Sequence, residues 1–363
     1  MQRPDSQVHD RRSVPESGHR APKKKKMSKG TKALLIIVCV IVAIALLLVG
    51  TILILSAVGR SALTDDGSGM TMEEYEGDAE SLGSGTVRYK GQLYQYNDEI
   101  IPILLLGVDE HEKNVQEGEF GVANQADVNV LAALDPKNGR ITMISISRDT
   151  MCEMDVLDDA GSHVGTATAQ LALAYTYGDG GDVSCELSAA AVSRLFYGLE
   201  IPVYASIYMD GITELVDAVG GVTVTPDVSF GPFVAGRETL LTGSNTERYI
   251  RYRESTTEGN NQRMQRQNQV LVALVRQMLA SVKQNPASVL NLYNNVSRNV
   301  TTNLDASKIL YLAQQAAKLR FDGEIRNVAG ESVLGAQNHA EYQVDEQALY
   351  ELILDVFYDP VTE

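Results

Sequence analysis

The chain contains no tryptophan, and aromatic residues make up only 6% of its 363 residues. It also lacks a nucleotide-binding loop: the glycine-rich run "GDGGD" (178 to 182) has neither the Lys-Ser/Thr of a P-loop nor the spacing of a dinucleotide fingerprint. The five histidines are too scattered for a zinc site. Hydrophobic residues nevertheless make up 44% of the chain, which is enough for one large or two modest globular domains.

Charged residues are absent from residues 33 to 59, an almost wholly apolar run that exceeds the roughly 20 residues needed to cross a bilayer. We expect an uncleaved transmembrane anchor, because a cleavable signal peptide has a shorter apolar core, although Ser56-Ala57 would allow cleavage. Residues 1 to 32 hold ten basic and three acidic residues, a net charge of +7. Because the whole chain has a net charge of −16, the residues after 32 carry −23. This asymmetry predicts a cytoplasmic N-terminal tail on a single-pass protein of the cell membrane, with the rest extracytoplasmic. A nucleic-acid partner for the lysines is disfavoured because a span follows at once.

Residues 60 to 86 are acidic, rich in glycine and serine and without hydrophobic period, so we expect a flexible linker. The folded domain should then occupy residues 87 to 363. Apolar runs at "IIPILLLGV", "VNVLAAL" and "ITMISIS" predict buried strands, with more at "PVYASIY", "GGVTVTP" and "GEIRNVAG". Helical periodicity predicts helices at about 166 to 178, 186 to 198, 211 to 218, 244 to 253, 261 to 284, 304 to 319 and 345 to 357. Strands and helices in this order predict an α/β fold in which helices sandwich a mixed central sheet.

Charged residues stand at three strand ends: Asp109, Asp127 and the pair Arg148-Asp149. Each alone is compatible with a solvated turn. If the strands are neighbours, however, two carboxylates and a guanidinium meet at one sheet edge, which suits Mg²⁺ and phosphate oxygens.

A second basic element comprises Arg251, Arg253, Arg263, Arg266 and Gln267, around a polar loop and the start of a long amphipathic helix. Arginines at a helix start oppose the helix dipole unless an anion is bound there. Spacing alone leaves two interpretations open: a phosphate site, or a solvated helix start with ion pairs to Glu254 and Glu258.

These residues stand in motifs that resemble the LytR-CpsA-Psr family of envelope phosphotransferases. The matching runs are "ILLLGVD", "ADVNVLAALDPKNGRITMISISRDT", "ALAYTYGDGG", "LVDAVGGVTV" and "RYIRYR" followed by "RMQRQNQVL", in this order over roughly residues 100 to 280. The resemblance implies an α-β-α fold that buries a polyprenyl chain. It also implies transfer of a glycopolymer, such as teichoic acid or capsular polysaccharide, from a polyprenyl-pyrophosphate lipid to peptidoglycan with Mg²⁺ or Mn²⁺, in a Gram-positive envelope.

Carried over residue by residue, the resemblance implies that Asp109 and Asp127 bind the metal. The residues that match the family's pyrophosphate-binding set are Arg148, Arg251, Arg253, Arg263, Arg266 and Gln267. Asp149 would orient Arg148 or cap its turn.

The sequence departs from the family pattern at Gln125-Ala126-Asp127-Val128, where the family commonly has Arg-Ser-Asp-Thr. The family's aspartate before Arg263 is also missing, so Glu258 is our hypothesis for a general base. Two alternative functions therefore stay open: a catalytically weakened lipid-pyrophosphate-binding scaffold or regulator of envelope assembly, and a pyrophosphatase that uses water as acceptor.

The two cysteines beyond the anchor, Cys152 and Cys185, are expected to form a disulfide, since one can persist outside the cytoplasm. Two buried free thiols are the alternative.

Overall fold

The structure, a computed structural model, describes residues 57–60, 63, 75, 77–110, 113, 119–121, 123–252, 259–336 and 338–361, and of residues 259–261 the backbone alone. All of them belong to one structural unit, which begins at Leu53. Within these ranges, no helix is both long and apolar enough to span a membrane. The predicted cytoplasmic tail and, apart from its last three residues, the predicted anchor lie outside the described residues.

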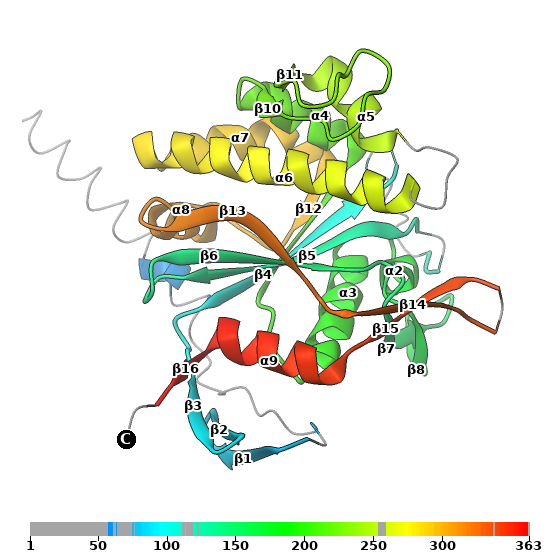
Figure 1. Ribbon diagram of the computed structural model, residues 1–363, viewed down its shortest axis with the longest axis vertical. Helices are drawn as coiled ribbons and strands as arrows, with labels where there is room; N and C mark the ends of the chain where they lie inside the picture. Colours follow the sequence, from blue (N-terminus) through cyan, green and yellow to red (C-terminus); the bar gives the residue numbers. More distant parts are fainter. Residues whose placement is uncertain are drawn as a thin grey trace, which may run out of the picture. The chain divides into compact units, whose positions relative to one another are not determined.

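The centre of the fold is a six-stranded mixed sheet (Figure 1). Its strands, in spatial order, are β12 (Val300–Thr302), β9 (Val203–Tyr208), β4 (Ile101–Val108), β5 (Ala126–Asp135), β6 (Arg140–Ile146) and β13 (Arg320–Asn327). The β9/β4 and β6/β13 pairs are parallel, and the other three are antiparallel. The mixed sheet and its three central apolar strands agree with the sequence-based expectation.

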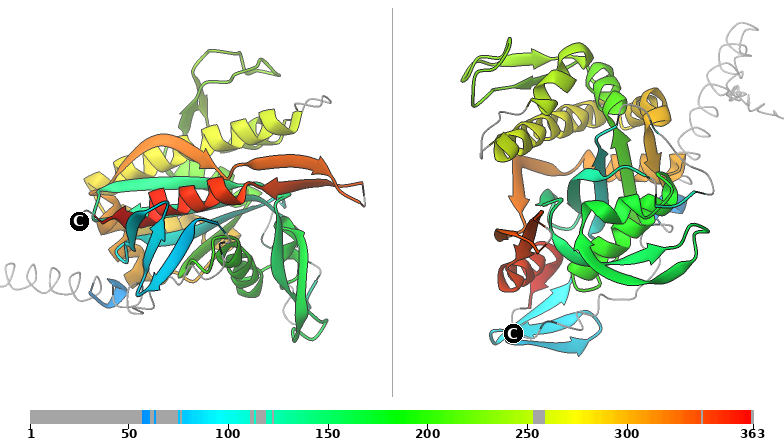
Figure 2. Two further views of the ribbon diagram at one scale, coloured as in Figure 1. Left: turned by 60° about the horizontal axis from the view of Figure 1, so that its bottom comes forward. Right: turned by 90° about the vertical axis from the view of Figure 1, so that its right-hand side faces the viewer.

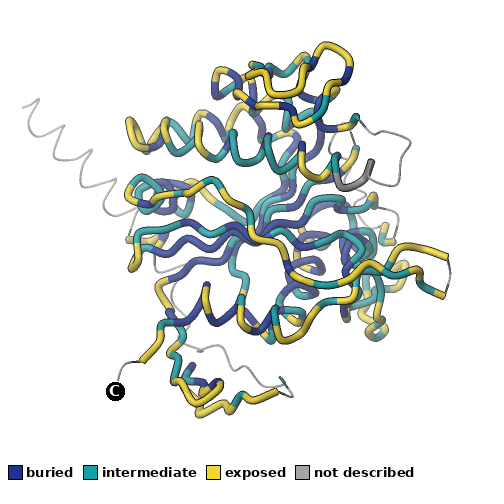
Figure 3. The backbone as a smooth tube through the Cα atoms, in the orientation of Figure 1, coloured by how far each residue is buried: buried dark blue, intermediate teal, exposed yellow. Residues whose placement is uncertain are grey.

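Both faces of this sheet are covered, as its continuous apolar strands require. Side chains of β5 alternate between the two cores: Leu131 and Ala133 belong to one cluster, and Val130 and Ala132 to another. The first cluster includes α3 (Asp182–Leu195) and α9 (Glu346–Phe357), and the second includes α6 (Gly259–Gln284) and α8 (Ala306–Ala316). The buried strands therefore run through the middle of a three-layer sandwich (Figure 3).

A smaller third cluster lies beyond α6 and contains Phe230, Phe233 and Tyr249. Its elements are α4 (Met209–Ala218), β10 (Val222–Val224), β11 (Thr239–Leu241) and α5 (Gly243–Arg251), with α7 (Ser288–Val296) and η1 (Ser297–Asn299) following α6. β10 pairs with β11, so the strand expected at "GGVTVTP" forms its own two-stranded sheet rather than joining the central one.

The prediction of a helix over 166 to 178 is wrong for the first part of that range. Residues His163–Gln170 form β8, which pairs with β7 (Met151–Leu157) in an antiparallel hairpin, and only α2 (Ala172–Thr176) is helical. Alternation of Thr166 and Thr168 with small residues suits a pleated strand better than a helix. A second hairpin, β14 (Gly330–Leu334) with β15 (Ala340–Val344), projects nearby (Figure 2).

The segment before the central sheet is also structured. β1 (Ala79–Gly83), β2 (Thr86–Tyr89), β3 (Gln92–Tyr96) and the C-terminal β16 (Tyr358–Pro360) form a four-stranded antiparallel sheet. Tyr75 stacks on Tyr350 of α9, with ring centroids 4.2 Å apart. Strand β1 and Tyr75 are thus part of the folded domain, although residues 60 to 86 were expected to form a flexible linker.

Candidate active site

The central sheet brings the predicted strand-end charges to one edge. In the strand register Val108 lies opposite Ala126, and Ile146 lies opposite Asn129. Asp109, Asp127 and Arg148 follow or adjoin these residues, so all three meet at the same end of β4, β5 and β6. The sequence-based expectation that these strands are neighbours is confirmed.

A glycine lets the two aspartate-bearing strands come together. A Cβ atom built on Gly107 would lie 2.9 Å from the Cβ of Val128, closer than side chains tolerate. The register also shifts between Gly107 and Val108, which is a bulge. Gly107 therefore fixes the approach of β4 and β5 directly beside the two aspartates.

Asp127 is the most enclosed charged group of this edge, with 12% of its side chain exposed. One carboxylate oxygen accepts a hydrogen bond from Arg148, and the other lies 4.0 Å from Arg263 Nη2 at the start of α6. Burial raises the pKa of Asp127, an effect that the guanidinium groups of Arg148 and Arg263 oppose and the nearby Asp109 reinforces. Two cations from distant parts of the chain thus converge on one carboxylate.

Asp109 has its own arginine. Arg251, the last residue of α5, places Nη2 3.1 Å from Asp109 Oδ1 and Nη1 2.9 Å from Glu247 Oε1. The hydrogen bond to Glu247 is the main cause of the raised pKa of Arg251, so this guanidinium stays charged. Glu247 was not singled out in the sequence, although its spacing of four residues from Arg251 on one helix is a usable signal.

Arg148 is held from several sides. It donates to Gln125 Oε1 and to Asp127, and its Nε lies 3.6 Å from Asp149 Oδ1. Gln170 donates to the same Asp149 oxygen at 3.3 Å and to the carbonyl oxygen of Ala340 at 2.5 Å. Gln170 carries no local sequence signal for this role, because only the hairpin brings it to Asp149.

Arg266 follows Arg263 by one turn of α6. It is 2% exposed, donates to the carbonyl oxygen of Tyr252, and packs 5.0 Å from the ring centroid of Phe230 and 5.3 Å from that of Tyr252. These contacts pack Arg266 against the third core cluster. Its predicted contact with pyrophosphate stays a prediction. Gln267, the next residue of α6, is partly exposed. The predictions for Arg253 and Glu258 fall outside the described residues.

The donor set is compatible with a magnesium ion. Asp109 and Asp127 supply carboxylate oxygens, and their electrostatic interaction shows that they share one neighbourhood. No group of three or more acidic, histidine or cysteine side chains suited to a metal is found in the part of the chain that the structure describes. Since Mg²⁺ is commonly held by one or two carboxylates together with substrate phosphates and water, two aspartates fit that kind of site.

The expected disulfide is not formed: Cys152 of β7 and Cys185 of α3 are both buried free thiols. Burial raises the pKa of each thiol to about 12. The thiol of Cys185 hydrogen bonds with Ser206 of β9, whereas Cys152 sits on a hairpin outside the central sheet. Each cysteine therefore acts as a small core residue, which is the alternative given above.

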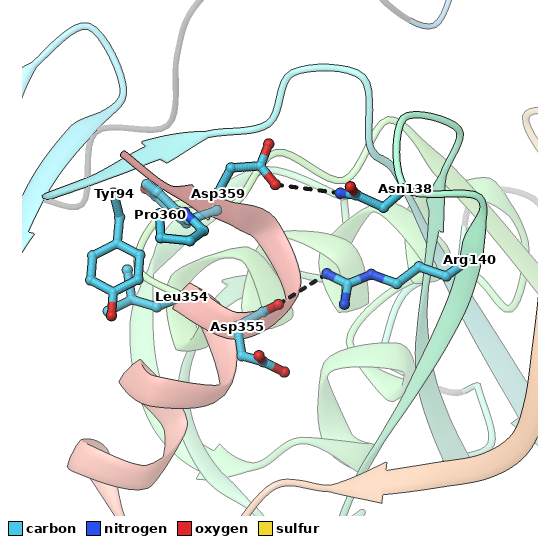
Figure 4. Close-up of a pocket in the computed structure, with 8 residues that line it drawn as sticks. Tyr94, Asn138, Arg140, Leu354, Asp355, Asp359 and Pro360 are labelled. Carbon is cyan, nitrogen blue, oxygen red and sulfur yellow. Dashed lines mark hydrogen bonds between the residues drawn. The ribbon is translucent and has the colours of Figure 1, made fainter. Parts of the chain in front are cut away.

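A surface pocket at the opposite end of the sheet is unrelated to these groups (Figure 4). Its lining includes Asn138, Arg140 and Asp359. Asn138 donates to Asp359 at 3.3 Å, and Arg140, the first residue of β6, donates to the carbonyl oxygen of Asp355 at 3.0 Å. These hydrogen bonds connect α9 and β16 to the central sheet, so the pocket lies where packed elements meet and has a structural role.

Comparisons with known proteins give matches over most of the chain. A family model described as the LytR_cpsA_psr family matches residues 67–353. A protein of Bacillus mycoides named polyisoprenyl-teichoic acid--peptidoglycan teichoic acid transferase TagU is 28% identical over 69% of this chain and 75% of its own length. A protein of the same name from Oceanobacillus iheyensis is 31% identical over 63% of this chain and 66% of its own length. The crystal structure of B. subtilis TagV superposes with a TM-score of 0.55, at 25% identity over 71% of this chain and 95% of that one.

The matched region contains the central sheet, both aspartates and all of the arginines discussed above. The chain therefore belongs to the LytR-CpsA-Psr family.

Proposed function

We propose that this protein transfers a glycopolymer of the teichoic acid or capsular polysaccharide type from a polyprenyl-pyrophosphate carrier to peptidoglycan, from a membrane-anchored position outside the cell. One observation carries the proposal: Arg148, Arg251 and Arg263 surround Asp109 and Asp127 at one sheet edge. Partly buried apolar side chains of β4, β5 and α6, including Leu105, Val128 and Leu271, adjoin that edge and offer a surface for the lipid chain. The names of the relatives support the same donor and acceptor.

The chemistry is a phosphoryl transfer. A sugar hydroxyl of peptidoglycan attacks the phosphorus that bears the glycan, the bond to the second phosphate breaks, and polyprenyl phosphate leaves. Arg148, Arg251 and Arg263 stabilise the negative charge that builds up on the transferring and leaving oxygens. Asp149 keeps the guanidinium of Arg148 oriented. Glu258 is our proposal for the group that accepts the hydroxyl proton.

Asp109 and Asp127 would hold Mg²⁺ or Mn²⁺, which supplies charge neutralisation at the phosphate oxygens. Both carboxylates contact arginines in the structure, so these arginines are already positioned around the place where phosphate would bind.

The test uses the full chain in detergent with a polyprenyl-pyrophosphate-linked sugar, Mg²⁺ and peptidoglycan fragments. We expect a glycan-peptidoglycan product and released polyprenyl phosphate. Arg148→Ala should lower the rate by about a hundredfold or more, as loss of a transition-state donor does. Arg237→Ala, which removes an exposed arginine of the loop before β11, is the matched control and should leave the rate unchanged.

One observation favours a second candidate, a lipid-pyrophosphate-binding scaffold or regulator. Gln125 stands where the family commonly has arginine, and its neutral amide accepts a hydrogen bond from Arg148 instead of adding a cation. Tight binding of the lipid without any turnover would support this candidate and contradict transfer. Release of free glycan phosphate without an adduct would indicate hydrolysis.

A further inference from the structure

The chain has an unusual charge distribution around helices α6 to α8. Residues 259 to 321 contain eight basic residues and a single acidic one, Asp305, although the whole chain carries a net charge of −16. Arg263 belongs to the active site, Arg266 is buried, and Arg276 donates to the carbonyl oxygen of Asp322. The remaining cations thus need a separate explanation.

Three of these cations flank α8: Lys308 in its first turn, and Lys318 and Arg320 just after its end. Lys318 and Arg320 are exposed, and Lys308 is partly exposed. The single acidic residue, Asp305, is occupied as the helix cap, where it accepts from the backbone amides of Ser307 and Lys308. From Asp305 to Arg320 the three cations and one carboxylate give a net charge of +2, while the carboxylate of Glu99 also lies near Tyr311.

The end of the predicted anchor and the residues just after it contact this same helix. Residues 57–60 are helical, and a Cβ atom on Gly59 would lie 2.5 Å from the carbonyl oxygen of Ser307 and 3.1 Å from Cβ of Tyr311. Leu63 is 9% exposed and belongs to the core cluster of Tyr311 and Leu312. Arg60, which is exposed, lies near enough to Tyr311 to influence its ionisation.

From these contacts we infer that the α8 surface, defined as Lys308, Lys318 and Arg320, rests on the membrane and binds anionic phospholipid headgroups. The inference relies on the membrane anchoring that is part of the proposed function. The apolar run ends at Gly59, and Gly59 contacts α8, so few residues separate the predicted span from this helix. Cations at a membrane surface each gain from the negative potential of anionic lipids, about fivefold in binding per Lys or Arg.

The inferred orientation places the active site away from the bilayer. Leu63 shares its cluster with Ile101 and Val203, which begin β4 and β9, whereas Asp109 follows the end of β4. Figure 2 shows residues 57–60 and the β14–β15 hairpin at opposite ends of the sheet.

The absence of tryptophan makes a clean test possible, because one introduced tryptophan reports alone. The full chain would carry Gln315→Trp, at a partly exposed position of α8, or Leu334→Trp, at a strand end that is 72% exposed on the far hairpin. Each variant is reconstituted, with the domain outward, in vesicles of phosphatidylcholine and phosphatidylglycerol in equal amounts that contain a dansyl-labelled headgroup. We expect strong energy transfer from Trp at 315 and several-fold weaker transfer at 334.

Charge dependence completes the test. Replacing Lys308, Lys318 and Arg320 by Gln, or omitting phosphatidylglycerol, should lower transfer at 315, while the control Arg237→Gln should not. Equal energy transfer from Trp at 315 and at 334 would overturn the inference. So would energy transfer from Trp at 315 that stays the same in the Gln variants and without phosphatidylglycerol. So would soluble poly(glycerol phosphate) that displaces α8 from the vesicles, since the surface would then recognise a polymer.

Two further readouts on the same samples separate this inference from the proposed function. Failure of the chain to float with the vesicles would refute the anchor and the inference together. Glycan transfer measured on the same vesicles reports the catalytic proposal independently of where α8 lies.

Discussion

Gln170 is the residue whose contacts best explain how Arg148 keeps its place. Both protons of one amide are used: one goes to Asp149, which lies beside Arg148, and the other to Ala340 of the second hairpin. A carboxylate cannot donate in this way, and an apolar side chain cannot donate at all. Gln170 is therefore a positioning residue that acts through Asp149.

We expect Gln170→Met to lower kcat roughly tenfold with little change in KM for the lipid, because the guanidinium is misoriented rather than lost. In an Asp149→Ala background the same change should have almost no further effect, which a double-mutant cycle measures. Gln170→Glu gives a second readout. It should recover activity as the pH falls and the new carboxyl group gains a proton to donate. Additive effects of the two substitutions would show that Gln170 does not act through Asp149.

Asp127 should make the stability of the protein depend on pH. Its pKa is raised in the folded protein, so the folded state binds this proton more tightly than the unfolded chain does. The stability that protonation adds is complete below the ordinary carboxyl pKa of 3.8 and is lost as the pH rises through the higher folded value. Urea unfolding at a series of pH values should show this loss in the wild-type protein and not in Asp127→Asn. An identical pH dependence in both proteins would contradict the assignment.

At the scale of elements, α8 depends on its cap. Asp305 accepts from Ser307 N at 2.8 Å and from Lys308 N at 2.9 Å, and its hydrogen bond with the Ser307 hydroxyl is the first cause of its lowered pKa. Asp305→Ala should cost about 1 kcal/mol of unfolding free energy, while Asp305→Asn, which can still cap, should cost less. Because the pKa of Asp305 is lowered in the folded protein, the stabilisation by its charged form is present above pH 3.8 and is lost as the pH falls through the folded value. The unfolding free energies of the wild-type protein and Asp305→Ala, measured in urea at a series of pH values, should therefore converge in acid.

The elements that sequence predicted best are those with a single strong periodicity. β4, β5, β6 and the long helix α6 each follow one apolar pattern over many residues. β8 was missed because Ala167 and Ala169 favour a helix, and pairing with β7 overrides that preference. α7 was also missed, since its nine residues are too few to show a clear helical period and need the cover of α4 and α6 to be stable.

The candidate site shows the same division. Asp109, Asp127 and Arg148 could be found because they stand at the ends of strands that are themselves predictable. The roles of Arg266 and Gln170 could not, because both depend on contacts between segments far apart in the chain. Tertiary packing, which sequence spacing does not contain, buries the guanidinium of Arg266 and brings Gln170 to Asp149.

At the scale of the whole molecule, the beginning and the end of the domain are joined. β16, from the C-terminus, pairs with β3, from the start of the domain, and Tyr358 is 3% exposed. Asp359 adds an ion pair with Lys137 at 2.7 Å. The terminal strand therefore closes the structure rather than trailing from it.

Deletion of residues 358 to 363 should lower the unfolding free energy by roughly 2 to 4 kcal/mol, as loss of a large buried side chain does. Asp359→Asn, which removes only the partly exposed ion pair, should cost less than about 1 kcal/mol. Thermal and urea unfolding of the two variants separate these contributions. A deletion no more costly than the point substitution would mean that β16 is dispensable.

The length of β4 has a consequence for where the reaction can take place. Its eight residues separate the end of the sheet near Leu63 from Asp109, a rise of about 26 Å at roughly 3.3 Å per residue. With α8 on the bilayer, the sheet acts as a spacer of fixed height. A carrier lipid would then have to thread its chain up through the apolar layer to present its phosphates. Peptidoglycan strands at about that distance from the membrane would be within reach of the active site, and strands closer to the membrane would not be used as acceptors.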